Sequence, residues 1–168
     1  MEKKIDWKTP LIDRAKIQAE VLVPVLKALR VELGVERANR LVWQALAERR
    51  REIARAMAAE FPGAPHEKWQ AAMEASVPSI GDSVDFEMLT QSDAAWDFNI
   101  TGCRLAEFFR QIGEPELGFA LFCSFDDSMA EEIGMSEVEL KRTGTIMQGM
   151  KHCDFRFAFQ RRAAPKQD

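Results

Sequence analysis

The chain has 168 residues, 46% of them hydrophobic, so it is long enough to form one domain with a substantial core. Its formal net charge is −4, and its basic residues are spread along helical faces, which argues against a nucleic-acid-binding protein. The polar N-terminus MEKKIDWKTPLIDRAK lacks an apolar signal segment, and no later stretch is apolar enough to span a membrane, so we expect a soluble cytoplasmic protein.

Residues 11–60 have the apolar periodicity of two helices, which Gly34 separates. We expect each helix to pack one face into the core, through Ile17, Val21, Leu22, Val25, Leu26 and Leu29 in the first and Leu41, Leu46, Ile53 and Met57 in the second. Pro24 should kink or interrupt the first helix. The sequence FPGAP at 61–65 should end the second, and a short third helix should follow over about 66–75.

After Pro78 the apolar period changes to that of strands. In SVDFEML and WDFNIT one face of each strand should be buried, formed by Val84, Phe86 and Met88 and by Trp96, Phe98 and Ile100. The turn residues TQSDA between them predict a hairpin. Residues 105–112 then predict a helix that Gly113 ends, 115–122 a second helical segment, and 126–134 a short helix or a loop.

A second antiparallel hairpin is predicted from residues 137–145 and 152–160. Because side chains alternate in a strand, one face carries Val138, Leu140, Arg142 and Gly144, and the facing row is Cys153, Phe155, Phe157 and Phe159. Pairing Leu140 with Phe157 buries the apolar residues of both strands on one side. In this register Gly144 lies opposite Cys153 and leaves open space beside the thiol.

The same register points Arg142 to the apolar side, opposite Phe155. An unpaired guanidinium there would cost several kcal/mol, so we expect a carboxylate partner. Two alternatives stay open, an internal ion pair, for instance with Asp126, and the carboxylate of a ligand. His152 and Asp154 lie on the opposite face by parity, so the run His-Cys-Asp cannot form a triad by itself.

The three cysteines, Cys103, Cys123 and Cys153, form no CxxC motif, and their odd number favours reduced thiols over a disulfide framework. The simplest interpretation is that each is a small core residue. A zinc site formed by the cysteines and His152 would lack the paired ligand spacing of structural zinc modules. We therefore expect no cofactor, and the question of a metal stays open.

Together these elements predict an α+β fold, in which N-terminal helices precede an antiparallel sheet of two hairpins with helices inserted between them. We expect a single domain over residues 1–160, with a helical part over 11–76 and a sheet-containing part over 82–160. Residues 161–168 should form a disordered tail.

The C-terminal half, over about residues 93–159, resembles the L-2-amino-thiazoline-4-carboxylic acid hydrolase family in the segments FNITGCRLAEFFRQIGEPELG, FCSFDD and LKRTGTIMQGMKHCDFRF. The motifs are Asn-x-x-x-Cys, Cys-x-x-Asp, Arg-Thr-x-Thr and Gly-x-x-x-Cys-Asp-Phe. They fall on Asn99 and Cys103, on Cys123 and Asp126, on Arg142, Thr143 and Thr145, and on Gly149, Cys153, Asp154 and Phe155. The N-terminal helices resemble the family only in general character.

The resemblance implies a hydrolase that opens a small carboxylated heterocyclic ring at a C–N or C–S bond, as in the conversion of aminothiazoline carboxylate to N-carbamoyl cysteine. Such a cyclic amide or amidine hydrolase needs an attacking group, a group that holds the substrate carboxylate, and acid–base help. Cys153 could be the nucleophile if Arg142 lowers its pKa, with Asp126 as general base and Cys103 lining the pocket. The candidates for substrate binding are Arg142, Asn99, Thr143, Thr145, His152 and Asp154.

Two other interpretations stay open. Water could attack the ring directly, with Cys153 only shaping the cavity. The pocket could also belong to a binding or sensor module that holds a small carboxylate through Arg142 without turnover. We expect neither nucleic acid nor a membrane as a partner, and whether the chain forms a homo-oligomer stays open.

Overall fold

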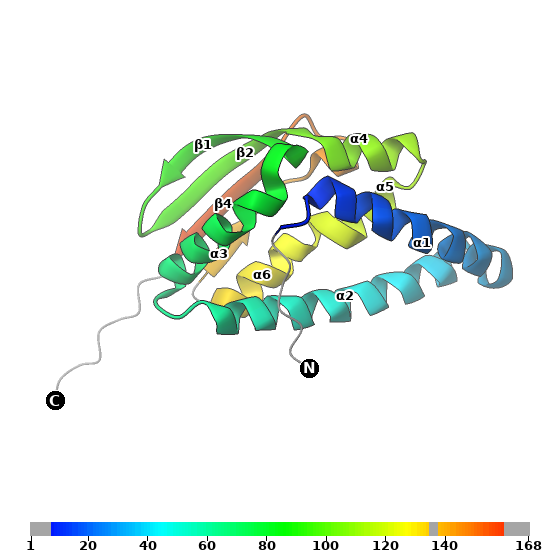
Figure 1. Cartoon of the computed structure of the whole chain (residues 1–168), viewed down its shortest axis with the longest axis horizontal. Helices are drawn as coiled ribbons and strands as arrows, with labels where there is room; N and C mark the ends of the chain where they lie inside the picture. The colour runs from blue at the N-terminus through cyan, green and yellow to red at the C-terminus, as the bar shows by residue number, and fades with distance from the viewer. Residues whose placement is uncertain (1–7, 135–137, 160–168) are drawn as a thin grey trace.

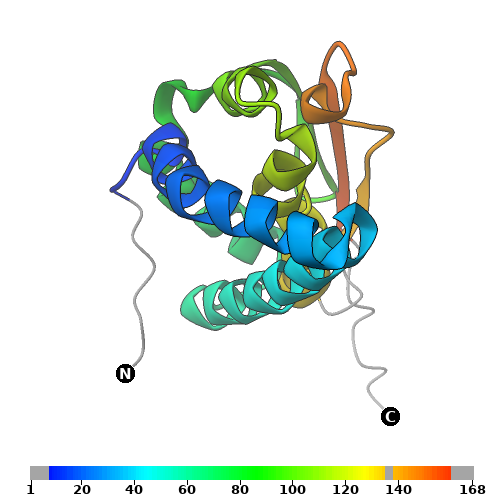
Figure 2. The same ribbon diagram turned by 90° about the vertical axis from the view of Figure 1, so that its right-hand side faces the viewer.

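The computed structural model describes residues 8–134 and 138–159 of the chain. It has the α+β fold that the sequence predicts, in which N-terminal helices precede a four-stranded antiparallel sheet with further helices inserted between the strands. The helices gather on one side of the sheet (Figures 1 and 2). The predicted tail over 161–168 lies outside the described residues.

Three helices form the N-terminal part, α1 (Leu11–Leu33), α2 (Val35–Glu60) and α3 (Pro65–Ile80). Gly34 makes the turn between the first two with a φ of 78°, in the region that favours glycine. The predicted interruption at Pro24 is wrong, because α1 continues through this residue. Pro24 lies on the exposed face, where water can satisfy the carbonyl that the proline ring leaves without a donor. The third helix runs to Ile80 and not to residue 75.

The α1 helix packs only part of its predicted face into the core, since Leu22, Leu26 and Leu29 lie on the inner side as predicted. Its buried and partly buried side is formed by Ala15, Ala19, Leu22, Leu26 and Leu29. Three residues predicted to be buried with this set, Ile17, Val21 and Val25, are exposed, so that part of the prediction is wrong. Two apolar stripes run along this helix, and the one with alanines allows the closest approach of neighbouring helices.

The sheet has the strand order β1-β2-β4-β3. Its strands are β1 (Val84–Gln91), β2 (Ala95–Cys103), β3 (Val138–Lys141) and β4 (Cys153–Phe159). The first two form the predicted hairpin. β3 pairs with β4 so that Leu140 lies opposite Phe157 and Val138 opposite Phe159, which confirms the predicted register.

β3 is shorter than predicted, because its pairing ends at Lys141 and not at residue 145. Beyond it, the backbone N–H groups of Thr143 and Gly144 donate to the carboxylate of Asp154 and not to a strand partner. After β3, therefore, the Asp154 side chain accepts these hydrogen bonds in place of the backbone of a paired strand. Residues 137 and 160, the outer limits of the predicted hairpin, lie outside the described residues.

β1 is an edge strand, and its predicted burial is wrong for most of its length. Val84 is partly buried, whereas Phe86 and Met88 are exposed. Their neighbours across the ladder, Ile100 and Phe98, pack against the core. Alternation therefore identified the inner face of β1, but no described part of the chain covers Phe86 and Met88 enough to bury them.

Aromatic residues join the sheet to the helices. Trp69 of α3 packs on Phe157 of β4 with ring centroids 4.1 Å apart, and Phe98 stacks on Phe155 at 4.7 Å. Stacked aromatic pairs of this kind contribute about 0.5–1.5 kcal/mol beyond their buried area. The Trp69–Phe157 pair joins β4 to α3, and the Phe98–Phe155 pair joins β2 to β4.

Between the two hairpins lie α4 (Arg104–Gln111), α5 (Pro115–Gly118), the π-helical turn η2 (Phe119–Cys123) and α6 (Phe125–Gly134). Glu114, which is buried, accepts two hydrogen bonds from Arg30 of α1 at 2.8 and 2.9 Å, so this inserted segment is tied to the N-terminal helices. Among the described helices, none combines the length and apolar character needed to cross a membrane.

Candidate functional site

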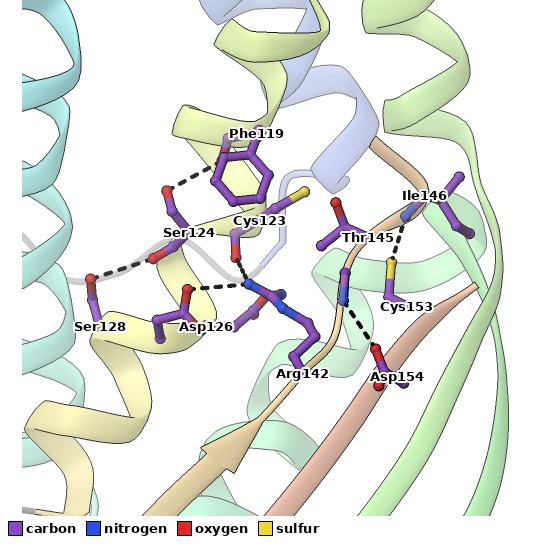
Figure 3. Close-up of polar contacts among 12 residues, drawn as sticks. Phe119, Cys123, Ser124, Asp126, Ser128, Arg142, Thr145, Ile146, Cys153 and Asp154 are labelled. Atoms are coloured by element: carbon purple, nitrogen blue, oxygen red, sulfur yellow. Dashed lines mark hydrogen bonds and ion pairs between the residues drawn. The ribbon is translucent and has the colours of Figure 1, made fainter. Parts of the chain in front are cut away.

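The three cysteines come from separate segments and gather at one end of the sheet. Cys103 ends β2 and caps α4, where its Sγ accepts a hydrogen bond from Ala106 N at 3.4 Å. Cys153 begins β4, and its Sγ accepts from Ile146 N at 3.2 Å. Cys123 ends η2, and its sulfur points toward Thr145, with Cys153 beyond it (Figure 3). π-Helical turns are rare and frequently occur at functional sites.

Arg142 lies between these thiols and α6, and its side chain is only 7% exposed. Its Nη1 donates to Asp126 Oδ2 at 2.9 Å, and its Nη2 donates to the carbonyl of Cys123 at 2.9 Å and to Asp127 Oδ2 at 3.2 Å (Figure 3). The guanidinium also lies 5.0 Å from the ring centroid of Phe155. The expectation that Arg142 pairs with a carboxylate is confirmed, with Asp126 as the internal partner.

Asp126 has an unusual protonation equilibrium for an aspartate. Burial raises its pKa to about 7, Arg142 opposes the rise, and the negative charge of Asp127 adds to it. The side chain nevertheless keeps a third of its surface exposed, so a proton can be exchanged with water or with a bound molecule. A carboxyl group with a pKa near neutrality is suited to general acid–base chemistry.

The thiols are held in their neutral form. Burial raises the pKa of Cys103, Cys123 and Cys153, and it acts most strongly on Cys123, where the nearby Asp126 adds to it. At Cys153 the Ile146 N–H and the Arg142 cation act in the opposite direction, but burial outweighs both. The condition set for Cys153 as nucleophile, a pKa lowered by Arg142, is therefore not met: Arg142 acts in that direction, but the pKa stays raised.

The open space predicted at Gly144, which was expected to lie beside the Cys153 thiol, is filled. A Cβ atom on Gly144 would lie 2.7 Å from Cγ of Met150, so this side chain packs directly over the glycine. The 3₁₀ turn η3 (Ile146–Gln148), which Thr145 caps through a bond from Gln148 N, folds the loop back and brings Met150 there. The prediction of open space at Gly144 is wrong, because strand pairing alone does not predict the path of this loop. Cys153 itself is buried.

Four of the proposed substrate-binding residues do not lie on the inner face of the sheet with the thiols: three lie on the outer face or bond to a residue there, and one is exposed. Asn99 and Asp154 face each other across β2 and β4 on the outer face, opposite to Phe98 and Phe155. The Asp154 carboxylate accepts from the backbone N–H and the hydroxyl of Thr143, the third of the four. His152, the fourth, is exposed.

Thr145 and Arg142, by contrast, lie on the inner side with the cysteines (Figure 3). Thr145 is fully buried, and its hydroxyl donates to Gln148 Oε1 at 3.1 Å. The structure thus divides the candidate residues into an inner group around Arg142 and an outer group around Asp154.

Three residues near these groups were not among the proposed catalytic or substrate-binding residues, although Cys123 is part of the Cys-x-x-Asp motif. They are Cys123, whose carbonyl binds Arg142, Asp127, which supplies a second carboxylate, and Met150, which covers Gly144. The run Cys-Ser-Phe-Asp-Asp held a signal for the first two, because a helical turn brings such residues to the same end of a helix. Nothing in the sequence pattern indicated Met150.

A cavity of about 320 Å³ lies at the opposite end of the sheet, between the β1–β2 turn, α3 and Phe159. It is therefore separate from the cysteine cluster. Within residues 8–134 and 138–159, no three His, Cys, Asp or Glu side chains are grouped to hold a metal ion.

Comparison with known proteins adds the family. A family model for L-2-amino-thiazoline-4-carboxylic acid hydrolase matches residues 14–157, and so extends beyond the C-terminal half into α1, α2 and α3. A search of curated proteins found no match. With most of its length matched, the chain belongs to the L-2-amino-thiazoline-4-carboxylic acid hydrolase family.

Proposed function

We propose that this chain is a hydrolase that opens a small carboxylated heterocyclic ring, of the aminothiazoline-carboxylate kind, at the inner group of residues around Arg142. The observation that supports this most is the Asp126 carboxyl, with a pKa of about 7, held by a buried guanidinium beside the thiols. Membership of the family supports the substrate class.

Cys153 is the proposed nucleophile. The Ile146 N–H already points at its sulfur at 3.2 Å, and Arg142 is near enough to favour the thiolate, so both would stabilise negative charge as it develops. Burial raises the pKa of Cys103 overall, although its backbone donors and the Arg110 cation favour the thiolate, and Glu107 opposes Arg110. Cys123 lies close to the negative Asp126, which disfavours its thiolate.

Because the Cys153 thiol is neutral, the reaction begins with transfer of its proton to Asp126, directly or through water. Sγ then bonds to the ring carbon between nitrogen and sulfur. The carbon–sulfur bond of the ring breaks, and the departing sulfur takes the proton from Asp126. Water next attacks the same carbon and gives a proton to Asp126. The bond from the carbon to Sγ then breaks, and Asp126 returns the proton to Cys153, which leaves as a thiol. The sum is substrate plus one water, giving the N-carbamoyl product.

The substrate carboxylate can bind at Nη2 of Arg142. The bond from Nη2 to Asp127 is the longer of the two ion-pair contacts, 3.2 Å against 2.9 Å to Asp126, and the Asp127 side chain is 54% exposed. Asp127 is therefore the partner that a ligand can replace at least cost, and the planar guanidinium would keep Asp126 at Nη1.

Incubation of the purified protein with 2-aminothiazoline-4-carboxylate tests the proposal. The product should gain the mass of one water, and one new thiol should appear for each turnover. Matched rings that lack the carboxylate, or that carry oxygen or nitrogen in place of the ring sulfur, define the specificity. Loss of turnover without the carboxylate is expected from the Arg142 contact.

Binding of the carboxylated rings without any turnover would instead favour the alternative, a small-carboxylate binding or sensor module. The observation that favours this alternative is that burial raises the pKa of all three thiols, so no thiolate is preformed. Neither binding nor turnover over the whole panel would contradict both.

A further inference from the structure

α1 carries a stripe of apolar residues that no described part of the chain covers. Its six members are all exposed, namely Ile17, Val21, Pro24, Val25, Ala28 and Val31. At 3.6 residues per turn they fall within an arc of about 120°, and the stripe is about 21 Å long. The exposed fractions are 61% for Ile17, 62% for Val21, 50% for Val25 and 83% for Val31.

This stripe is additional to the side of α1 that packs in the core. Ala15, Ala19 and Leu26 have at most 3% of their surface exposed, so the helix already has a complete inward face. A surface helix ordinarily carries polar residues on its other side. A continuous exposed apolar surface instead marks an interaction site. Figure 2 shows α1 running across the front of the molecule, where another protein could reach it.

We propose that the stripe packs against the same stripe of a second copy of this chain, with the two α1 helices antiparallel about a twofold axis near Pro24. In this arrangement Ile17 lies near Val31 of the second copy. A self-complementary patch of this kind is what a twofold dimer interface requires.

Charge complementarity supports a second copy of the chain as the partner that packs on the stripe. Glu20 and Lys27 are both exposed and lie along the same flank of the stripe, on either side of Pro24. When a twofold axis relates two antiparallel helices, the same flank of each helix faces the other copy. Glu20 then lies opposite Lys27 of the second copy, and Lys27 lies opposite Glu20 of the second copy. An anionic membrane surface suits the stripe less well, because its flank has mixed charges and the chain has a net charge of −4.

The first test is the mass of the full chain in solution, measured by sedimentation from about 1 μM to about 1 mM, the range in which weak interfaces associate. We expect a concentration-dependent dimer. The variant Ile17→Glu/Val21→Glu should be monomeric over this range, and it should melt at the wild-type temperature when both are measured where the wild type is monomeric. Val77→Glu is the matched control, because Val77 of α3 is 61% exposed and lies outside the stripe, and it should still dimerise.

The second test addresses the register. Glu20→Lys and Lys27→Glu should each weaken the dimer by roughly threefold to tenfold, because each places like charges opposite one another. The double variant Glu20→Lys/Lys27→Glu should restore it. Additive losses in the double variant would overturn the antiparallel pairing.

Three other results would overturn the proposal itself. They are a monomer over the whole range, a dimer that persists in Ile17→Glu/Val21→Glu, and a monomer that sediments with phosphatidylglycerol vesicles. None of them bears on ring opening, because α1 supplies no residue of the inner group.

Discussion

Asp126 should set the pH dependence of catalysis. With a pKa of about 7 raised by burial, its base form appears as the pH rises through neutrality. We predict that kcat/KM of the wild type rises through about pH 7, and that Asp126→Asn loses most of the activity together with this rise. Profiles of kcat/KM against pH for the two proteins check this. An active variant with the wild-type profile would contradict the role as base.

The same carboxyl links stability to pH. Its pKa is about 7 in the fold against an ordinary 3.8, so between these values the native state binds more protons than the unfolded state. The stability that Asp126 contributes is therefore present at low pH and falls as the pH rises from about 4 to about 7. The difference in free energy of unfolding between wild type and Asp126→Asn, measured by urea denaturation, should change in this direction. A difference that does not vary with pH would contradict the raised pKa.

Gly144 is required by the packing of Met150. A Cβ atom at this position would lie 2.7 Å from Met150 Cγ, so Gly144→Ala should destabilise the fold by about 1–3 kcal/mol. Adding Gly144→Ala to a Met150→Ala background should cost much less, because the obstructing side chain is gone. Thermal unfolding of the three variants measures this coupling. Equal costs in both backgrounds would show that Met150 does not fill this space.

At the scale of elements, two phenylalanines of the sheet lie in very different surroundings. Phe157 of β4 is buried against Trp69, whereas Phe86 of the edge strand β1 is exposed. We predict a loss of about 3–5 kcal/mol for Phe157→Ala and a change within about 0.5 kcal/mol for Phe86→Ala. Urea denaturation compares the two. Similar costs would contradict the uneven covering of the sheet.

The same contrast explains how much of the elements could be predicted. Alternation of side chains set Leu140 opposite Phe157, because a shift by one residue would have turned every apolar side chain outward. It could not show that Phe86 is exposed, since a strand pattern is the same with or without a covering helix. For α1, periodicity alone could not separate the stripe with Ile17 from the one with Ala19, because both are apolar at helical spacing.

At the scale of the whole molecule, the inner group depends on contacts between distant segments. The pairing of Arg142 with Asp126 could be expected, because a buried guanidinium requires a carboxylate and the family motifs contain both. The raised pKa of the thiols could not be predicted, since it comes from burial by helices inserted between the hairpins. The position of Met150 depended on the loop after β3, which sequence periodicity does not describe.

The most direct test of the central claim is the turnover of Cys153→Ser, measured together with its melting temperature. Ile146 N–H can also donate to a serine hydroxyl, so the fold should be kept. Because a hydroxyl is far more protonated than a thiol, turnover of aminothiazoline carboxylate should fall by about a hundredfold or more, whereas Cys103→Ser, the matched control, should keep most of it. Near-normal turnover in Cys153→Ser would contradict the account and assign the attack to water activated by Asp126.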